Sequence, residues 1–192
     1  MKKRVFIPLS ILILIAFSIK LIFSDYEFGK YDSFEEAIEK GIPYKNKHII
    51  HTELHDHVTV VFYTTVPILD DTAPTNYEII SVAFFEGSDR KGWENIGHNG
   101  WTHYDNKNMT VYYEHLIVSD DEGNLLHDFH VVFGEIHNNG IEKVETTTVE
   151  DKGFKQANMI NDLGKRYYYQ FGNNHIVRGL SKDGKVIDRQ GG

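Results

Sequence analysis

Residues 125–141 read LLHDFHVVFGEIHNNGI, and this stretch decides what kind of fold the chain can form. Residues 125–136 are rich in β-branched and aromatic side chains, which is typical of a strand. The cluster Asn138-Asn139-Gly140 follows, and Asn-Gly is a hairpin signal because it accepts positive φ. We therefore predict a strand, a tight turn and a returning strand over residues 141–149.

Runs of the same character recur along the chain between turn clusters such as residues 120–124 and 181–184. Residues 154–163 have some helical spacing, but they are few and lie between strand-like runs, so we favour a strand there. The other predicted strands are residues 48–52, 58–65, 77–86, 93–104, 109–119, 165–171, 174–180 and 185–189. Eight or more short strands predict a mainly β fold, an antiparallel sandwich or a barrel-like sheet.

One short helix is expected before the strands. Ser33-Phe34-Glu35-Glu36 is a capping box, in which Ser33 accepts from the backbone of Glu36 and the Glu36 side chain returns a bond. Glu36 and Lys40 form an i,i+4 pair, and Gly41 ends the helix. So short a helix must pack its Phe34 face on another element.

The N-terminal residues 5–23 form an apolar run that is long enough to cross a membrane. Basic residues precede the run and acidic residues follow it, so the N-terminus is expected in the cytoplasm and the rest of the chain outside. The alternative is a cleaved signal peptide, which would secrete the domain, but no small-residue cleavage pattern follows the run. We expect a single-pass anchor over residues 1–24 and one exported domain over residues 25–192.

Charge and composition limit the classes of partner and the chemistry that are possible for this exported domain. Residues 1–24 hold four basic residues and no acidic one, which leaves 16 basic and 28 acidic residues, a net charge of −12. Such a domain repels phosphate backbones, so nucleic acid is excluded as a partner. The chain has no cysteine, which rules out disulfides and thiol chemistry. Exported proteins without cysteine are usual on Gram-positive cell surfaces.

Several segments together resemble known proteins. They are the basic and apolar N-terminus, Ser33-Phe34-Glu35-Glu36-Ala37-Ile38, residues 131–136 leading to residues 141–144, and the ending over residues 181–187. This order is similar to that of uncharacterised small membrane-anchored or secreted proteins of Bacillus-type Gram-positive bacteria. The resemblance implies an all-β exported domain and a strand over residues 155–160. It implies no catalytic residue, because none is established in those proteins.

Histidine is unusually frequent, with 11 residues in 192. His51, His55 and His57 cluster near acidic residues, and a neutral imidazole is the commonest transition-metal ligand, so Zn²⁺ or Cu²⁺ is a candidate cofactor there. His55 and His57 share a face if both lie in a strand, whereas in a turn they could converge with His51. A second group lies in residues 127–130, where the two imidazoles point to opposite faces of an extended chain. The alternative for both groups is surface and strand-pairing histidines.

A second candidate site lies in residues 92–104, where aromatic residues alternate with Gly97 and Gly100. Where glycines in a hairpin leave the neighbouring aromatic rings accessible, these rings can stack on sugar rings or hold a peptide. The alternative is that both tryptophans belong to the core. The candidate binding residues are Trp93, His98, Trp101, His103 and Tyr104.

Motifs that would name a reaction are missing from the sequence. It has no nucleophile elbow, no phosphate-binding loop, no dinucleotide fingerprint and no cysteine nucleophile. We therefore expect a non-catalytic binding module with no cofactor, tethered at the envelope, whose partner is an envelope protein or a cell-wall ligand. The alternative is a metal-dependent envelope hydrolase, or a metal-binding protein, that uses His51, His55 and His57.

Overall fold

The computed structural model describes residues 29–44, 47–66, 68–70, 73–74, 77–151 and 153–191. The expected anchor over residues 5–23 lies outside these residues and stays a prediction. Among the described residues, no helix is both long and apolar enough to cross a membrane.

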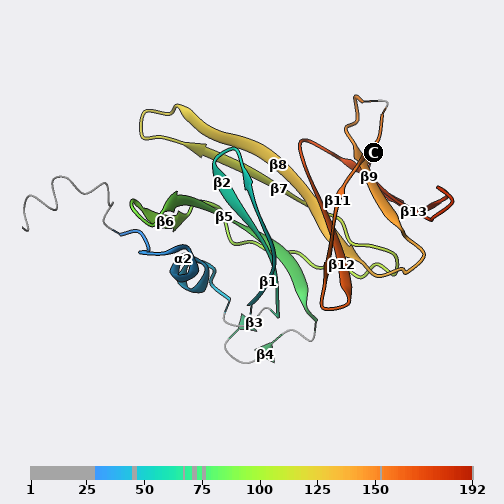
Figure 1. Ribbon diagram of the computed structural model, residues 1–192, viewed down its shortest axis with the longest axis horizontal. Helices are drawn as coiled ribbons and strands as arrows, with labels where there is room; N and C mark the ends of the chain where they lie inside the picture. The colour runs from blue at the N-terminus through green and yellow to red at the C-terminus, as the bar shows by residue number, and fades with distance from the viewer. Residues whose placement is uncertain are drawn as a thin grey trace, which may run out of the picture. The chain divides into compact units, whose positions relative to one another are not determined.

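The predicted mainly β fold is confirmed, and the described part of the chain has one short helix and three antiparallel sheets of four strands each (Figure 1). The elements are α2 (Phe34–Gly41), β1 (Lys47–His55), β2 (Val58–Thr65), β3 (Ile68–Asp70), β4 (Ala73–Pro74), β5 (Ile79–Ser88), β6 (Gly92–Asn95), β7 (Tyr112–Ser119), β8 (Leu125–Ile136), β9 (Lys143–Thr147), β10 (Lys155–Gln156), β11 (Asn158–Asp162), β12 (Lys165–Phe171), β13 (Ile176–Leu180) and β14 (Val186–Gln190). The ambiguous stretch over residues 154–163 forms β10 and β11, as favoured, and β3 pairs with β4 in a separate small ribbon.

The described residues divide into two compact units. The smaller unit contains residues 29–41 and 87–94, and the larger unit contains residues 42–86 and 95–191. The two units are described separately below.

The smaller unit holds α2, whose N-terminus differs from the predicted capping box in one bond. The Glu36 amide donates to Ser33 Oγ at 3.2 Å, as expected, but the Glu36 carboxylate accepts from the Asp32 amide at 3.0 Å. The Glu36 side chain therefore bonds the backbone of Asp32, the residue before Ser33, and not the backbone of Ser33 itself. The predicted pair of Glu36 with Lys40 is present at 2.6 Å.

The first sheet of the larger unit runs β1-β2-β5, and β5 continues past Glu86 into the smaller unit, where β6 is its neighbour. A two-residue turn joins β1 to β2. Its residues, Asp56 and His57, both have positive φ, of 49° and 63°, as the tight hairpin turns of twisted strands require. β2 is buried along almost its whole length, so side chains on both faces of this strand contribute to packing.

The second sheet runs β11-β12-β8-β7 and faces the first sheet across an aromatic core (Figure 1). Alternation along each strand sends every second side chain into this core. The first sheet contributes Val58, Val60, Phe62, Ile80, Val82 and Phe84, and the second contributes Tyr112, Leu116, Phe129, Val131, Phe133, Tyr167 and Tyr169. The core therefore holds the two sheets face to face.

The third sheet runs β10-β9-β13-β14, and its residues share a second core with the opposite face of β8 and β12. Val132 and Ile136 of β8 and Tyr168 of β12 lie in this core, with Val144 of β9 and Val177 of β13. β8 is thus buried on both faces from Val131 onward, whereas only one face is buried before it.

This arrangement corrects the predicted hairpin at residues 138–140. The turn forms, with the Gly140 amide donating to Asn138 Oδ1 at 2.8 Å. However, β8 pairs with β7 and β12, whereas β9 pairs with β10 and β13. The Asn-Gly turn therefore carries the chain from one sheet to another, because each face of β8 needs its own cover.

At Gly134 another backbone segment, the one that contains Thr110, approaches β8 closely. A Cβ atom on Gly134 would lie 1.9 Å from the Thr110 carbonyl oxygen, which also accepts a bond from the buried Tyr168 hydroxyl at 2.7 Å. Only glycine fits this approach.

We expect Gly134→Ala to lower the free energy of unfolding by about 1–3 kcal/mol or more, because the new methyl group must push Thr110 or β8 aside. Gly153→Ala is the matched control, since a Cβ there meets nothing within 4 Å. Urea denaturation of both variants measures the difference. Equal stability of the two variants would contradict the close approach at Gly134.

Candidate functional site

A small pocket opens at the edge of the larger unit, between the first and second sheets. Its volume is about 220 Å³. The walls comprise Ile80 and Ser81 of β5, Trp101, Thr102 and Tyr104 of the segment that follows β6, Val111 before β7, Tyr112, Tyr113 and Glu114 of β7, and Phe133 of β8. Half of these side chains are aromatic, and Glu114 is the single carboxylate among them.

Residues 96–104 lie along the edge of β5, held by bonds at several points. The Ile96 amide donates to the Phe84 carbonyl at 2.9 Å, and Ser81 Oγ donates to the Gly100 carbonyl at 3.1 Å. Gly97 sits directly on the Phe84 ring, where a Cβ would approach Cδ2 to 2.5 Å. The segment therefore brings Trp101 and Tyr104 to the pocket without forming a strand. Of the strand predicted over residues 93–104, only residues 93–95 form one, as part of β6.

Tyr104 fixes the far end of this segment. Its hydroxyl accepts a bond from the Val111 amide, and it lies 2.8 Å from the Val111 carbonyl oxygen and 3.1 Å from Oε1 of Gln190. Burial raises the pKa of Tyr104, and burial likewise raises the pKa values of Tyr112 and Tyr113. The three hydroxyls of the wall therefore stay protonated at neutral pH. The hydroxyl of Tyr104 donates within the protein, and that of Tyr113 donates to the His175 carbonyl.

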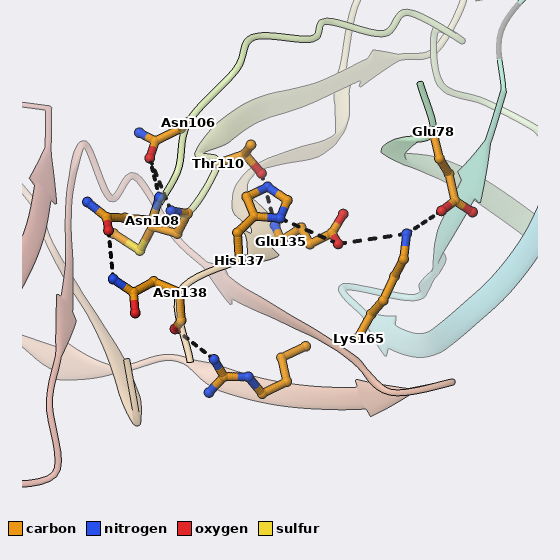
Figure 2. A network of polar contacts seen from close by, with 10 residues as sticks. Glu78, Asn106, Asn108, Thr110, Glu135, His137, Asn138 and Lys165 are labelled. Carbon is orange, nitrogen blue, oxygen red and sulfur yellow. Dashed lines mark hydrogen bonds and ion pairs between the residues drawn. The ribbon is translucent and has the colours of Figure 1, made fainter. Parts of the chain in front are cut away.

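Beyond Tyr104 a polar network ties the chain to the end of β8 (Figure 2). Asn106 Oδ1 accepts from the Asn108 amide at 2.8 Å, and Asn138 Nδ2 donates to Asn108 Oδ1 at 2.8 Å. The Glu135 amide donates to Thr110 Oγ1 at 3.0 Å. These bonds fix the backbone that leads into β7, and with it the wall formed by Tyr112 to Glu114.

Three charged side chains extend the same network toward β5. Lys165 of β12 pairs with Glu78 and lies 3.8 Å from Glu135, whose carboxylate is 3.7 Å from Nδ1 of His137 (Figure 2). Partial burial opposes the charge on Lys165, but the two carboxylates outweigh it and raise the pKa of this lysine. These contacts join segments that are far apart in the sequence, so a structural role is enough to explain the network. The pocket is therefore the stronger candidate for a functional site.

The structure gathers four of the five predicted binding residues in one region. Trp101 and Tyr104 line the pocket, and Nε2 of His98 contacts the carboxylate of Glu114 at 2.5 Å. His103 stacks on the ring of Tyr77, with ring centroids 4.0 Å apart. The Tyr77 ring also lies edge to face with the Trp101 ring, at a centroid distance of 6.4 Å.

The fifth residue, Trp93, belongs to the smaller unit. Its ring packs on Phe34, with centroids 4.9 Å apart, and its indole N–H donates to Asp89 at 2.8 Å. Trp93 is partly buried and thus has packing and hydrogen-bond partners of its own within the smaller unit.

The three predicted metal ligands have different surroundings. Nε2 of His51 lies 3.2 Å from the Tyr169 hydroxyl, and the His55 ring stacks on Phe171 at a centroid distance of 3.9 Å. His57 is exposed in the turn between β1 and β2. Among the described residues, three potential ligand atoms converge elsewhere, at His115, Asp128 and His130.

Sequence reasoning missed His115 and the wall residues of β7. The signal was present, because the turn cluster at residues 120–124 implies a hairpin, and pairing across it sets His115 opposite His130. The expected opposite orientation of the two imidazoles in residues 127–130 is confirmed: His127 is buried on the side of Phe129, whereas His130 faces away. Partial burial and the nearby His115 lower the pKa of His130.

Comparisons of the chain with protein-family models, with curated proteins and with solved structures found no significant match. The site is therefore interpreted from its own geometry. That geometry is a small aromatic pocket with tyrosine hydroxyls, a serine, a threonine and one carboxylate at its wall.

We expect Tyr104→Phe to lower the free energy of unfolding by about 1–3 kcal/mol, because the Val111 amide loses its acceptor in a half-buried position. Tyr113→Phe is the control, since the Tyr113 hydroxyl bonds the His175 carbonyl at an exposed site and its loss costs less. Thermal or urea unfolding compares the two variants. A smaller loss for Tyr104→Phe than for Tyr113→Phe would contradict the anchoring role of Tyr104.

Proposed function

We propose that this protein is a non-catalytic binding module, tethered to the outer face of the cytoplasmic membrane, that holds a sugar ring of a cell-wall glycan in the pocket beside Trp101. The observation that carries the proposal is the pocket of about 220 Å³ walled by Trp101, Tyr104 and Tyr112 to Glu114. The same region was singled out by its aromatic residues in the sequence.

The chemistry of the wall suits a carbohydrate. Aromatic faces offer flat apolar area to the C–H face of a sugar, while the Ser81 hydroxyl oxygen and the Glu114 carboxylate offer acceptors for its hydroxyl groups. Ligand pockets usually measure about 300–1,000 Å³, so this pocket fits one ring of a longer chain better than a whole large ligand.

The location follows from the N-terminal sequence. Residues 5–23 are long enough to span a membrane, and the basic residues before them favour a cytoplasmic N-terminus. The rest of the chain carries a net charge of −12, so it has no electrostatic attraction to an anionic membrane, and the N-terminal segment supplies the tether. Cleavage of this segment would instead release a secreted domain with the same pocket.

The alternative of a metal-dependent hydrolase at His51, His55 and His57 has less geometric support. His51 and His55 are both engaged with aromatic side chains of β12, so ligation there requires these contacts to be given up. The proposed module needs no catalytic step.

The chain contains two tryptophans, which makes fluorescence a direct test of the pocket. In the Trp93→Phe variant of the full chain, kept in detergent, Trp101 is the only indole. We expect its emission to change on titration with N-acetylglucosamine oligosaccharides, because the sugar ring lies on the Trp101 face. Stem peptides without sugar are the parallel probe, and a response to the peptides alone would replace the glycan with a peptide ligand.

Truncation separates binding from folding. We expect Trp101→Ala to weaken retention on purified peptidoglycan by about tenfold or more, since aromatic anchors carry most of the binding free energy. Trp101 is only half-buried, so its loss should cost less stability than the 3–5 kcal/mol typical of a core tryptophan. Trp93→Ala is the matched control and should retain peptidoglycan. Unchanged retention by Trp101→Ala would overturn the proposal.

A further inference from the structure

Three metal-binding side chains project from one face of the β7–β8 hairpin, away from the aromatic core. Nε2 of His115 lies 2.7 Å from Oδ1 of Asp128, and the rings of His115 and His130 are stacked with centroids 3.7 Å apart. One ligand atom from each of the three residues falls within a span of 4.8 Å.

Strand register explains this convergence. His115 of β7 is directly opposite His130 of β8, and Asp128 precedes His130 by two residues, so both β8 side chains point to the same face. Directly opposed and diagonal neighbours on one face of an antiparallel pair are close enough to touch. The backbone positions are therefore set by the sheet and do not depend on a mobile loop.

We propose that His115, Asp128 and His130 form a binding site for a divalent transition-metal cation of the Zn²⁺ class. Two imidazoles and one carboxylate are a donor set that such cations prefer, whereas Ca²⁺ and Mg²⁺ take oxygen ligands. The site is separate from the pocket beside Trp101, because none of its three residues lines that pocket.

The observed spacing is compatible with ligation. Zn²⁺ lies about 2.0–2.2 Å from nitrogen and oxygen ligands, which places neighbouring ligand atoms roughly 3.3 Å apart in a tetrahedron. The side chains of His115 and Asp128 are 38% and 48% exposed, so both can rotate by the small amount required. His130 is more enclosed and provides the fixed ligand.

Three protein ligands leave a fourth position that faces solvent. This is the composition of metal sites that keep a water or an exchangeable group, in contrast to closed structural sites with four protein ligands. The acidic balance of the exported region, with 28 acidic and 16 basic residues, raises the local concentration of cations around the site.

The test is Zn²⁺ binding to the full chain after removal of metal with a chelator. We expect calorimetry to give one Zn²⁺ per chain, and Co²⁺ to acquire the visible absorption of an imidazole complex. His115→Gln, Asp128→Asn and His130→Gln should each weaken Zn²⁺ binding by about tenfold or more, because each removes one of three ligands. Circular dichroism checks that these variants remain folded, and His115 and Asp128 are exposed enough to tolerate the change.

His48→Gln is the matched control, since His48 forms a similar pair with Asp162 at 2.6 Å, and among the described residues no third ligand atom converges on that pair. It should bind Zn²⁺ as the parent chain does. Absence of Zn²⁺ binding, or binding that survives all three substitutions, would overturn the site. Loss of binding in His51→Gln, His55→Gln or His57→Gln instead would assign the metal to the cluster predicted from sequence. None of these outcomes depends on glycan binding by the pocket.

Discussion

The larger unit depends on one constraint, which is that β8 is buried on both faces from Val131 onward. Phe129, Val131 and Phe133 enter the core shared with the first sheet, while Val132 and Ile136 enter the core shared with the third sheet. One partner sheet covers only one face of a strand. An apolar face left in water would not contribute the stabilisation that burial of its surface provides, so a strand with two apolar faces needs a partner on each side. The chain therefore leaves β8 through a turn that changes sheets.

The same constraint accounts for the crossing at Gly134 and for the pocket. With β12 on one edge of β8, the segment before β7 must run along the other edge, and its close approach at Thr110 requires glycine. Hydrogen bonds from Tyr104 and from the asparagines at 106, 108 and 138 fix this segment. An irregular connection held in this way can place Trp101 at a sheet edge, where a strand would have buried it or paired it.

Burial also divides the histidines into two classes. His51 and His55 lie against aromatic residues of β12, so their contacts continue the packing of the core. His115 and His130 lie on the outward face of the β7–β8 hairpin, with Asp128 beside them. The histidines that cluster in the sequence therefore pack against aromatic residues. The group on the surface is instead formed by residues of two different strands, β7 and β8. Whether an imidazole packs against the protein or is open to a metal ion therefore depends on which face of its strand it occupies.

The amino-acid sequence by itself determined the local structure. It was sufficient to predict α2, the bounds of β2, β8 and β12, and the turns around residues 120–124 and 181–184, because alternation, capping and turn chemistry act over a few neighbouring residues. It also placed Trp101 and Tyr104 in a candidate site. Only the tertiary structure decided that the turn at residues 138–140 leads to another sheet, that Trp93 belongs to a different unit, and that His115 meets Asp128 and His130. These outcomes depend on which face of a strand finds a partner, and that choice is made by packing between residues far apart in the chain.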